Sequence, residues 1–350
     1  MKKVLWMFFA VAFSTFSSCS KKSDGNNVVT PPPATYKAPV VSPAFSKGAD
    51  ISWVTQMESS GVRFYDKSGN PQDLFALLKS LGFNSIRLRA WVNPADGWCN
   101  TADLVAKAIR AKNAGMKIMI DFHYSDSWAD PGKQPKPAAW AVLNFATLVT
   151  TLHDYTVSTM NTLKTNGITP DWVQVGNEVD DGILWEDGRA STHMANFAAL
   201  VEAGYQAVKS ISNTSKVIVH VSNGFNNTLF RYLFDGLKNN GAHWDIIGMS
   251  LYPSTTNYTT LDTQCQANIN DMVARYGTPV MLCEVGMTAN DPSTSRDFLT
   301  DIITKTNMIA SGNGLGVFYW EPEAYNWQGY SLGAFDNTGK PTIALDAFGN

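Results

Sequence analysis

Two glutamates, Glu178 and Glu284, occur in a context that suits a catalytic pair. Glu178 follows the apolar run 173–175 with Asn177 directly before it, and Glu284 follows the apolar run 279–283. A single glutamate at the end of a strand usually caps the next helix or pairs with an arginine. Hydrolysis of a glycosidic bond needs one carboxylic acid that is held protonated and a second that is ionised. Two glutamates in this position therefore favour glycoside hydrolysis.

The elements that would position these glutamates recur along the chain. Short apolar or β-branched runs alternate with amphipathic stretches, a pattern that predicts alternating strands and helices. Gly82, Gly115 and Gly167 stand where a helix must stop before the next strand. The predicted strands are residues 48–52, 85–90, 117–122, 172–176, 217–221, 246–250, 279–283 and 316–320. The predicted helices include residues 73–79, 102–114, 140–164 and 194–211.

Eight strands that alternate with helices predict an α/β protein with a single (β/α)8 TIM barrel over residues 45–350. A doubly wound open sheet is the alternative. Such a sheet normally carries a glycine-rich phosphate loop after its first strand, whereas residues 48–50 lead into Ser52 and Trp53. In a barrel, chemistry is performed at the carboxyl ends of the strands. The polar and aromatic residues at those ends are Asp50, Arg87, Arg89, Asp121, His123, Asn177, Glu178, His220, Asn223, Ser250, Tyr252, Glu284, Trp320 and Glu321.

Several stretches together resemble one enzyme family. They are residues 48–52 (Gly-Ala-Asp-Ile-Ser), 87–94, 121–132, 175–178 (Val-Gly-Asn-Glu) and 320–322 (Trp-Glu-Pro). Asn-Glu after the fourth strand and Glu after the seventh resemble the large clan of retaining (β/α)8 glycosidases. The long third stretch narrows the resemblance to the endo-β-1,4-galactanases of glycoside hydrolase family 53. The resemblance implies hydrolysis of β-1,4-galactan, the side chain of pectin known as type I arabinogalactan, with retained anomeric configuration.

The resemblance also implies roles for single residues. Glu178 would be the general acid/base, Glu284 the nucleophile, and Asn177 the partner of the sugar 2-hydroxyl. A retaining mechanism implies carboxyl groups roughly 5 to 5.5 Å apart. We expect burial and the charge of Glu284 to raise the pKa of Glu178. Arg89, which is nearer the rim than Arg87, is the arginine expected to keep Glu284 ionised, and Arg87 either shares that role or forms a buried ion pair.

Further residues are expected to bind the substrate, and each has a plain structural alternative. His123, His220 and Tyr252 would hold the nucleophile and the sugar, although histidines at strand ends are as often satisfied core groups. Trp91, Trp128 and Trp320 would stack against galactose rings, with core filling as the alternative. Asp121 is also expected at the substrate. Trp185, Trp327 and Tyr325 are candidates for outer subsites.

The amino-terminal residues predict export. Residues 1–19 combine a basic start with an apolar run that is too short to span a bilayer, followed by Ser17, Ser18 and Cys19. This resembles a bacterial lipoprotein signal in which Cys19 is lipidated, and ordinary signal cleavage is the alternative. Residues 20–44 are rich in Lys, Ser, Asn and Pro and predict a flexible tether. We therefore expect a cell-envelope lipoprotein whose lipid anchor is its only contact with the membrane.

The overall composition excludes several classes of partner. A net charge of −3 with both signs dispersed argues against binding to nucleic acid. The cysteines after the tether, Cys99, Cys265 and Cys283, allow at most one disulfide among them. No zinc-type cluster is apparent, and residues 285–295 hold Asp291 as their one acidic residue, so we expect no metal, no calcium and no cofactor. A monomer is the default expectation.

Three rival functions fit parts of the same pattern. An endo-mannanase, glucanase or xylanase would share both glutamates, but it would not explain residues 121–132. A surface protein that only binds glycan would keep the aromatic residues without needing both Glu178 and Glu284. A structural envelope protein would leave the polar strand ends unexplained.

Overall fold

The computed structural model describes residues 36–349, and residues 37 onward form one compact unit. The predicted signal peptide, Cys19 and most of the predicted tether lie outside the described residues. The last residues assigned to the tether belong to the compact unit: Val41 packs against the core, and the Ser42 amide donates to Asn307 Oδ1 at 2.9 Å. Within residues 36–349, no helix has the length and apolar character needed to cross a bilayer.

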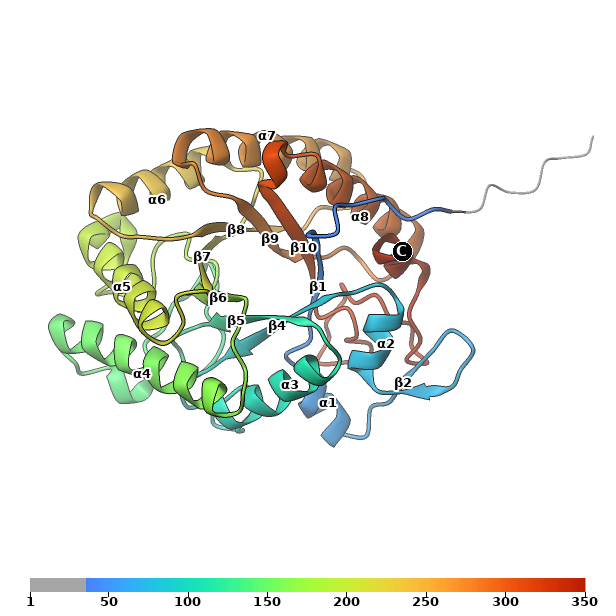
Figure 1. Cartoon of the computed structure of the whole chain (residues 1–350), viewed down its shortest axis with the longest axis horizontal. Coiled ribbons are helices and arrows are strands. Elements are labelled where there is room, and N and C mark those ends of the chain that lie inside the picture. Colours follow the sequence, from blue (N-terminus) through green and yellow to red (C-terminus); the bar gives the residue numbers. More distant parts are fainter. Residues whose placement is uncertain (1–35, 350) are drawn as a thin grey trace, which may run out of the picture. The chain divides into compact units, whose positions relative to one another are not determined.

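Eight parallel strands form a closed barrel, in which β1 pairs with both β4 and β10 (Figure 1). This closure confirms the (β/α)8 prediction and excludes the open sheet. The strands of the barrel are β1 (Ser46–Asp50), β4 (Ser85–Ala90), β5 (Lys117–Phe122), β6 (Trp172–Val175), β7 (Lys216–Val221), β8 (Ile246–Leu251), β9 (Val280–Val285) and β10 (Gly314–Trp320). Each lies within a few residues of a predicted strand.

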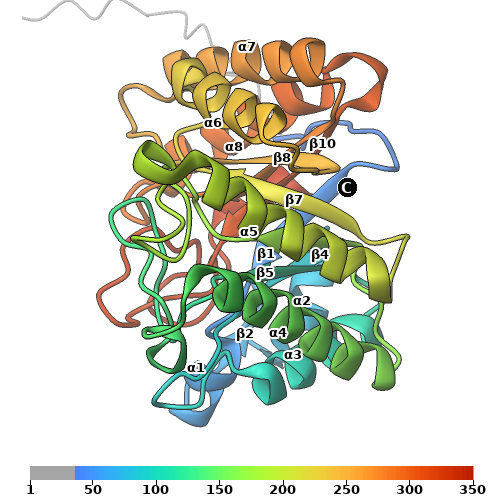
Figure 2. The same ribbon diagram turned by 90° about the vertical axis from the view of Figure 1, so that its left-hand side faces the viewer.

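Helices surround the barrel, and α4 and α5 run side by side along one flank (Figures 1 and 2). The α-helices are α1 (Val54–Ser59), α2 (Leu74–Ser80), α3 (Thr101–Asn113), α4 (Phe145–Thr165), α5 (Ala190–Ile211), α6 (Asn227–Asn239), α7 (Tyr258–Tyr276) and α8 (Pro292–Asn307). Residues 36–349 also form the 3-10 turns η1 (Ala138–Trp140), η2 (Ala310–Gly312) and η3 (Ile343–Phe348).

The helix ends follow local chemistry that is visible in the sequence. The side chains of Asp73, Asn100 and Asn144 accept hydrogen bonds from first-turn amides of α2, α3 and α4. The Asn144 cap explains why α4 begins at Phe145, so the start predicted at residue 140 is wrong. The three predicted C-cap glycines all have positive φ, +98° at Gly82, +66° at Gly115 and +70° at Gly167, as predicted.

A short antiparallel hairpin, β2 (Phe64–Tyr65) with β3 (Pro71–Gln72), lies between α1 and α2 and was not predicted. Its strands are two residues long, which is too short to show a period-2 pattern. The turn is closed by Asp66, whose side chain accepts from the amide of Asn70 at 2.8 Å.

The interior of the barrel has two layers of different polarity. Apolar side chains fill the part nearer the strand starts: Met119, Trp172, Ile218, Ile246, Met281, Cys283 and Phe318, which we call the apolar plug. Gly48 is required here because a Cβ at this position would lie 2.1 Å from the Phe318 ring. Nearer the carboxyl ends, charged and polar side chains replace the apolar ones, and these build the site described next.

Candidate active site

A cavity of about 310 Å³ opens at the carboxyl ends of the strands, and both Glu178 and Glu284 line it. Its other lining residues are His123, Trp128, Ala129, Asp130, Asn177, Tyr252, Trp320, Tyr330 and Leu332. The fold therefore brings together the two glutamates that the sequence singles out. The cavity combines the carboxyl groups of these two glutamates and of Asp130 with aromatic surface, a combination suited to chemistry on a sugar.

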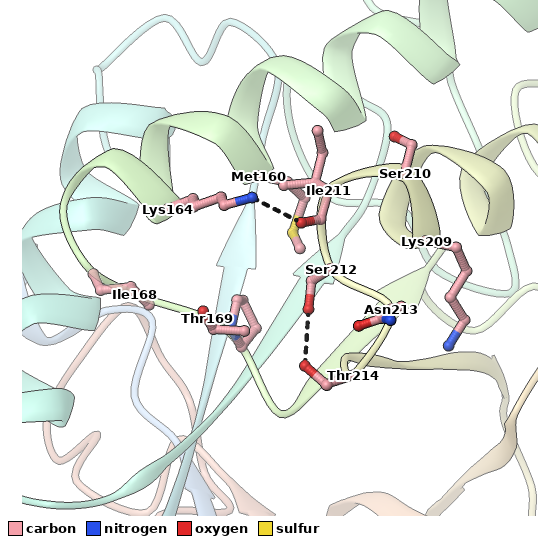
Figure 3. A pocket seen from close by; sticks show the side chains of 11 residues that line it. Met160, Lys164, Ile168, Thr169, Lys209, Ser210, Ile211, Ser212, Asn213 and Thr214 are labelled. Atoms are coloured by element: carbon pink, nitrogen blue, oxygen red, sulfur yellow. Dashed lines mark hydrogen bonds between the residues drawn. The ribbon is translucent and has the colours of Figure 1, made fainter.

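A second hollow, of about 390 Å³, lies between the carboxyl ends of α4 and α5 (Figure 3). It is lined by lysines, small polar residues and aliphatic side chains, without a carboxylate or an aromatic ring. Its lysines are already engaged: Lys164 Nζ donates to the Ile211 carbonyl at 3.2 Å, and Lys209 Nζ pairs with Asp245 at 2.6 Å. This hollow therefore lacks the carboxyl groups and the aromatic surface of the first cavity.

Glu178 is presented to the cavity by a left-handed turn that follows β6. Its φ of 44° is sparsely populated for a residue with a side chain, as is common where a site constrains the backbone. Gln134 Nε2 donates to the carbonyl of Asn177 at 2.9 Å and fixes this turn. Ser250 Oγ lies 2.6 Å from Glu178 Oε1. Burial first, and then the negative charge of Glu284, raises the pKa of Glu178 to about 8.

Glu284 is better provided with donors. Arg87 NH2 lies 2.8 Å from its Oε1, and the Tyr252 hydroxyl donates to its Oε2 at 2.9 Å. Burial raises the pKa of Glu284 to about 7, while the Arg87 charge and the Tyr252 hydrogen bond oppose that rise. Because a guanidinium and a phenol stabilise the Glu284 carboxylate, and a single hydroxyl meets Glu178, Glu284 is the first of the pair to ionise.

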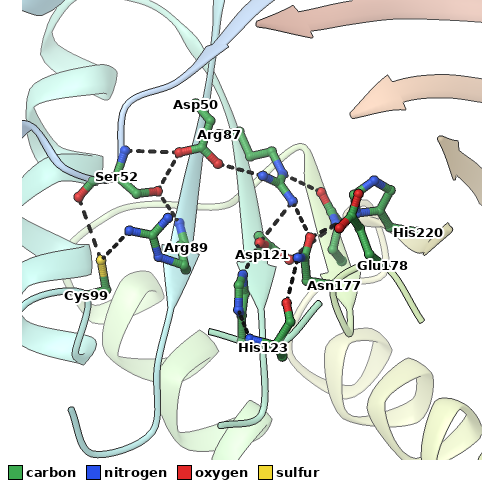
Figure 4. Close-up of polar contacts among 12 residues, drawn as sticks. Asp50, Ser52, Arg87, Arg89, Cys99, Asp121, His123, Asn177, Glu178 and His220 are labelled. Atoms are coloured by element: carbon green, nitrogen blue, oxygen red, sulfur yellow. Dashed lines mark hydrogen bonds and ion pairs between the residues drawn. The ribbon is translucent and has the colours of Figure 1, made fainter. Parts of the chain in front are cut away.

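Arg87, not Arg89, is the arginine paired with Glu284, so the prediction for Arg89 is wrong. Arg87 is fully buried and lies at the centre of the polar layer (Figure 4). It donates to Asp50 at 2.6 Å, to Gln174 at 2.6 Å and to Asn177 at 2.9 Å, and it pairs with Asp121 at 2.9 Å. The two alternatives given for Arg87 therefore occur at the same time: its side chain pairs with Glu284 and also forms buried ion pairs with Asp50 and Asp121.

Arg89 instead serves the aromatic wall. Its guanidinium lies 3.4 Å from Glu321. It stacks on Trp128 at 4.1 Å and on Trp91 at 4.8 Å from the ring centroids, a geometry favourable for cation–π attraction. Arg89 is 1% exposed and does not line the cavity, so it positions Trp128 from behind.

The predicted sugar-binding polar residues divide into two groups. Asn177 and Tyr252 line the cavity, and His123 lines it with its ring while both of its nitrogens are engaged. His123 Nδ1 accepts from the Ala129 amide at 3.1 Å, and its Nε2 donates to Asp121 at 2.9 Å. Asp121 and His220 were expected to contact the substrate, but both are fully buried and neither lines the cavity.

Among the predicted stacking residues, Trp128 and Trp320 line the cavity and Trp91 does not. Trp91 is 8% exposed because Trp128 packs edge-on in front of it, with ring centroids 5.2 Å apart. The three outer-subsite candidates also lie away from this cavity. Trp185 packs over Arg189 at 3.7 Å, the Tyr325 hydroxyl donates to the Arg63 carbonyl at 2.7 Å, and Trp327 packs against the core.

Three residues of the site were not assigned a role from the sequence: Ser250, Tyr330 and Gln134. Ser250 was identified only as a polar strand end, although its hydroxyl contacts Glu178. Tyr330 lies in the loop after β10, and its signal was one more aromatic residue in a polar, glycine-containing segment. Gln134 belongs to the proline-rich stretch after β5, and nothing in its local sequence points to the turn it supports.

The described cysteines are unpaired, and the one acidic residue of the loop after β9 serves as a helix cap. Cys99, Cys265 and Cys283 are all buried and free. Asp291 caps α8, where its side chain accepts from the Thr294 amide at 3.0 Å. Within residues 36–349, no group of three or more His, Cys, Asp or Glu side chains has a geometry suited to a metal ion.

Comparison with known proteins places this geometry among the glycosidases. The family model described as glycosyl hydrolase family 53 matches residues 46–348. The arabinogalactan endo-β-1,4-galactanase of Thermothelomyces thermophilus is 33% identical over 83% of this chain and 93% of that protein. The catalytic domain of an Ignisphaera aggregans family 53 enzyme superposes with a TM-score of 0.83 at 28% identity, covering 91% of this chain and 99% of that one. A structure of fungal β-1,4-galactanases superposes with a TM-score of 0.79 at 30% identity, covering 86% and 98%.

Proposed function

The chain belongs to glycosyl hydrolase family 53, and we propose that it is an endo-β-1,4-galactanase that acts by a double displacement with Glu178 and Glu284. Its substrate would be the β-1,4-galactan of type I arabinogalactan, since the named relatives act on this polymer. The observation that carries the mechanism is the unequal environment of two carboxyl groups in one cavity. Glu284 has a guanidinium and a phenol as partners, and Glu178 has a single hydroxyl.

In the first step, the Glu284 carboxylate attacks the anomeric carbon while Glu178 gives its proton to the glycosidic oxygen. The C–O bond to the leaving chain breaks and a galactosyl ester forms on Glu284. In the second step, Glu178, now ionised, takes a proton from water as that water attacks the anomeric carbon and frees Glu284. Two inversions give net retention, and each residue recovers its starting protonation state.

Asn177 supports the transition state through an amide whose orientation is fixed. Its Oδ1 faces Arg87 at 2.9 Å and His220 at 3.0 Å, and its Nδ2 donates to the Ala129 carbonyl at 2.9 Å. An amide nitrogen carries two hydrogens, so one N–H is left for a ligand. We propose that this N–H bonds the 2-hydroxyl of the galactose attached to Glu284, where hydrogen bonds strengthen as the oxocarbenium character develops.

Linear β-1,4-galactan tests the proposal, with mannan, xylan and β-glucan for comparison. We expect short galacto-oligosaccharides from galactan alone, released with retained configuration in early ¹H NMR spectra. Glu284→Gln is expected to lower the rate at least about a thousandfold, as for removal of a nucleophile. Glu186→Gln is the matched control, because Glu186 is an exposed glutamate that pairs with Arg189. Activity on another polymer alone would refute the substrate, and binding of galactan without hydrolysis would favour the rival glycan-binding protein.

We also propose export, lipidation at Cys19 and a monomeric state, on the strength of the sequence. Radiolabelled palmitate incorporated by the full chain in a bacterial host, and lost in Cys19→Ala, would support the lipid anchor. Release of the soluble, unlabelled native protein would instead favour ordinary signal cleavage. Size-exclusion chromatography with light scattering would test the monomer.

A further inference from the structure

We propose that Ser250 and His220 are positioning residues that keep Glu178 protonated in the resting enzyme. A chain of hydrogen bonds with fixed directions runs from Arg87 through Asn177, His220 and Ser250 to Glu178. At the end of this hydrogen-bond chain, Ser250 Oγ can accept a hydrogen bond from Glu178 but has no hydrogen left to donate to it. The inference rests on the role of Glu178 as general acid in the proposed function, although its first tests do not need the reaction.

The direction of the chain is set at Arg87, since a guanidinium donates and never accepts. Arg87 NH2 lies 2.9 Å from Asn177, so the amide atom that faces it is the oxygen (Figure 4). The amide nitrogen of Asn177 is held in the opposite direction by the Ala129 carbonyl at 2.9 Å. A flipped amide would set a donor against a donor at one end and an acceptor against an acceptor at the other.

The Asn177 oxygen then fixes the tautomer of His220. His220 Nδ1 lies 3.0 Å from this oxygen and must carry a hydrogen in order to bond to it. His220 is fully buried, and its burial, together with the Arg87 charge, lowers its pKa well below the usual value, so the ring is neutral. A neutral imidazole carries one N–H, which leaves Nε2 as an acceptor.

Ser250 transmits this constraint to Glu178. Its Oγ lies 2.8 Å from His220 Nε2 and 2.6 Å from Glu178 Oε1, and a hydroxyl has one hydrogen for two neighbours. Because His220 Nε2 can only accept, the Ser250 hydrogen points to His220. The remaining partner at 2.6 Å, Glu178 Oε1, must therefore supply a hydrogen of its own, which means that the carboxyl group is protonated.

Ionisation of Glu178 breaks the pattern. If the Ser250 hydrogen turns to the new carboxylate, His220 Nε2 loses its donor. If it does not, two oxygen lone pairs face each other at 2.6 Å. Either arrangement costs a hydrogen bond in a buried site, where an unsatisfied group is expensive. The hydrogen-bond chain therefore favours the protonated form of Glu178 before the first step. It also makes the Glu178 carboxylate a better base in the second step.

The charged groups around Glu178 and His220 do not replace the effect of the hydrogen-bond chain on the protonation of Glu178. Glu178 is faced by Glu284 from β9 and by Asp180 from its own loop, which both favour its protonated form, and by Arg87 from β4, which opposes it. His220 is faced by Arg87, by Asp121 and by His123 from β5. These charges shift the balance in both directions. Among residues 36–349, the hydrogen-bond acceptor that we assign to Glu178 is Ser250 Oγ.

The first test reads the tautomer directly in the native protein. The chain contains five histidines, so their ring ¹⁵N signals can be resolved and assigned by single substitutions. We expect His220 to be neutral with its hydrogen on Nδ1 and none on Nε2. His123 serves as an internal reference, because its contacts demand the opposite tautomer, with the hydrogen on Nε2. A hydrogen on Nε2 of His220 would overturn the proposal without any variant being made.

The second test measures the pKa of Glu178 by ¹³C NMR of labelled carboxyl groups, assigned with Glu178→Gln. The chain has seven glutamates, which keeps the spectrum simple. In His220→Phe the Ser250 hydrogen is free to turn to Glu178, and we expect the pKa to fall by about one unit. Adding Ser250→Ala to that variant removes the donor and should raise the pKa again. His243→Phe, which removes an exposed histidine that pairs with Glu202, should leave the pKa of Glu178 unchanged.

A double-mutant comparison makes the result decisive. If Ser250 already donates to Glu178 in the native protein, Ser250→Ala will raise the pKa of Glu178 equally with and without His220, and the proposal fails. If the effect of Ser250→Ala is large only in the His220→Phe background, the proposal is supported. The basic limb of kcat/KM on galactan should then fall to lower pH in His220→Phe. Failure of galactan hydrolysis with the expected NMR result would refute the proposed function and leave the hydrogen-bond chain intact.

Discussion

Replacement of Tyr252 by phenylalanine should raise the pKa of Glu284 and move the acid limb of the pH profile to higher pH. The Tyr252 hydroxyl donates to Glu284 Oε2 at 2.9 Å, and this bond stabilises the ionised form. A hydrogen bond to a charged group contributes about 1.5 to 3 kcal/mol, and 1.36 kcal/mol corresponds to one pKa unit. The acid limb should therefore move up by about one to two pH units.

The sign follows from the roles proposed for the two glutamates. The productive enzyme has Glu284 ionised and Glu178 protonated, so activity rises as Glu284 loses its proton and falls as Glu178 loses its own. In the native protein the pKa of Glu284 is raised to about 7 and that of Glu178 to about 8, which predicts a narrow optimum between them. Raising the pKa of Glu284 shrinks the population with this arrangement, so maximal kcat/KM should also fall about tenfold or more.

The assay is kcat/KM on linear β-1,4-galactan across the pH range, with Tyr330→Phe as the matched control. Tyr330 lines the same cavity, but its hydroxyl donates to the Trp320 carbonyl at 3.0 Å, whereas that of Tyr252 donates to Glu284. Its loss should alter binding without moving the acid limb. An unshifted acid limb in Tyr252→Phe, or an equal shift in Tyr330→Phe, would refute the reasoning.

Three further predictions concern stability and binding. Asp262→Asn should raise the melting temperature at pH 8 and should not raise it near pH 4. Burial and the neighbouring Asp301 raise the pKa of Asp262 to about 9 in the folded protein. The native Asp262 therefore lowers the free energy of unfolding progressively as pH rises from the pKa of the unfolded state to about 9, and the Asp262→Asn substitution removes this penalty. An equal gain at both pH values would contradict this. Gly48→Ala should destabilise the fold by about 1 to 3 kcal/mol in urea titrations, because its Cβ would overlap Phe318, and an unchanged midpoint would contradict the plug's tight packing. Trp128→Ala should raise KM for galactan about tenfold or more, the cost of truncating an aromatic anchor; an unchanged KM in steady-state kinetics would remove Trp128 from the binding surface.

The sequence is sufficient to predict the eight strands of the barrel and which of their ends carry glutamates, because both depend on local patterns. It does not predict the β2–β3 hairpin, whose strands are too short to show a pattern. The sequence is insufficient to predict how deep in the barrel each side chain lies and which partner it therefore meets. Arg87 and Arg89 lie on the same side of β4, and their spacing alone suggests that the one nearer the rim meets Glu284. In the structure, Arg87 pairs with Asp50 and reaches Glu284, while Arg89 turns to Glu321. That choice depends on strand register and on partners far away in the chain.

The aromatic residues show the same limit. Trp91 and Trp128 both follow strands and look equally suited to stacking on a sugar. Only tertiary packing decides that Trp128 stands in front and Trp91 behind, with Arg89 against both rings. Ser250 illustrates the opposite case. A serine is unremarkable in sequence, and it gains importance here from two distances, to His220 and to Glu178, that no local pattern encodes.

The apolar plug seals the barrel beneath the polar layer. In the proposed mechanism, water can therefore reach the galactosyl ester on Glu284 only from the open side of the cavity, the side through which the cleaved chain would leave. Any galactan chain in solution approaches from that same side, so its hydroxyl groups compete with water for the ester. At high oligosaccharide concentration the enzyme should join galactose units as well as separate them. The lengths of its products would then depend on how much polymer surrounds it, and not on its subsites alone.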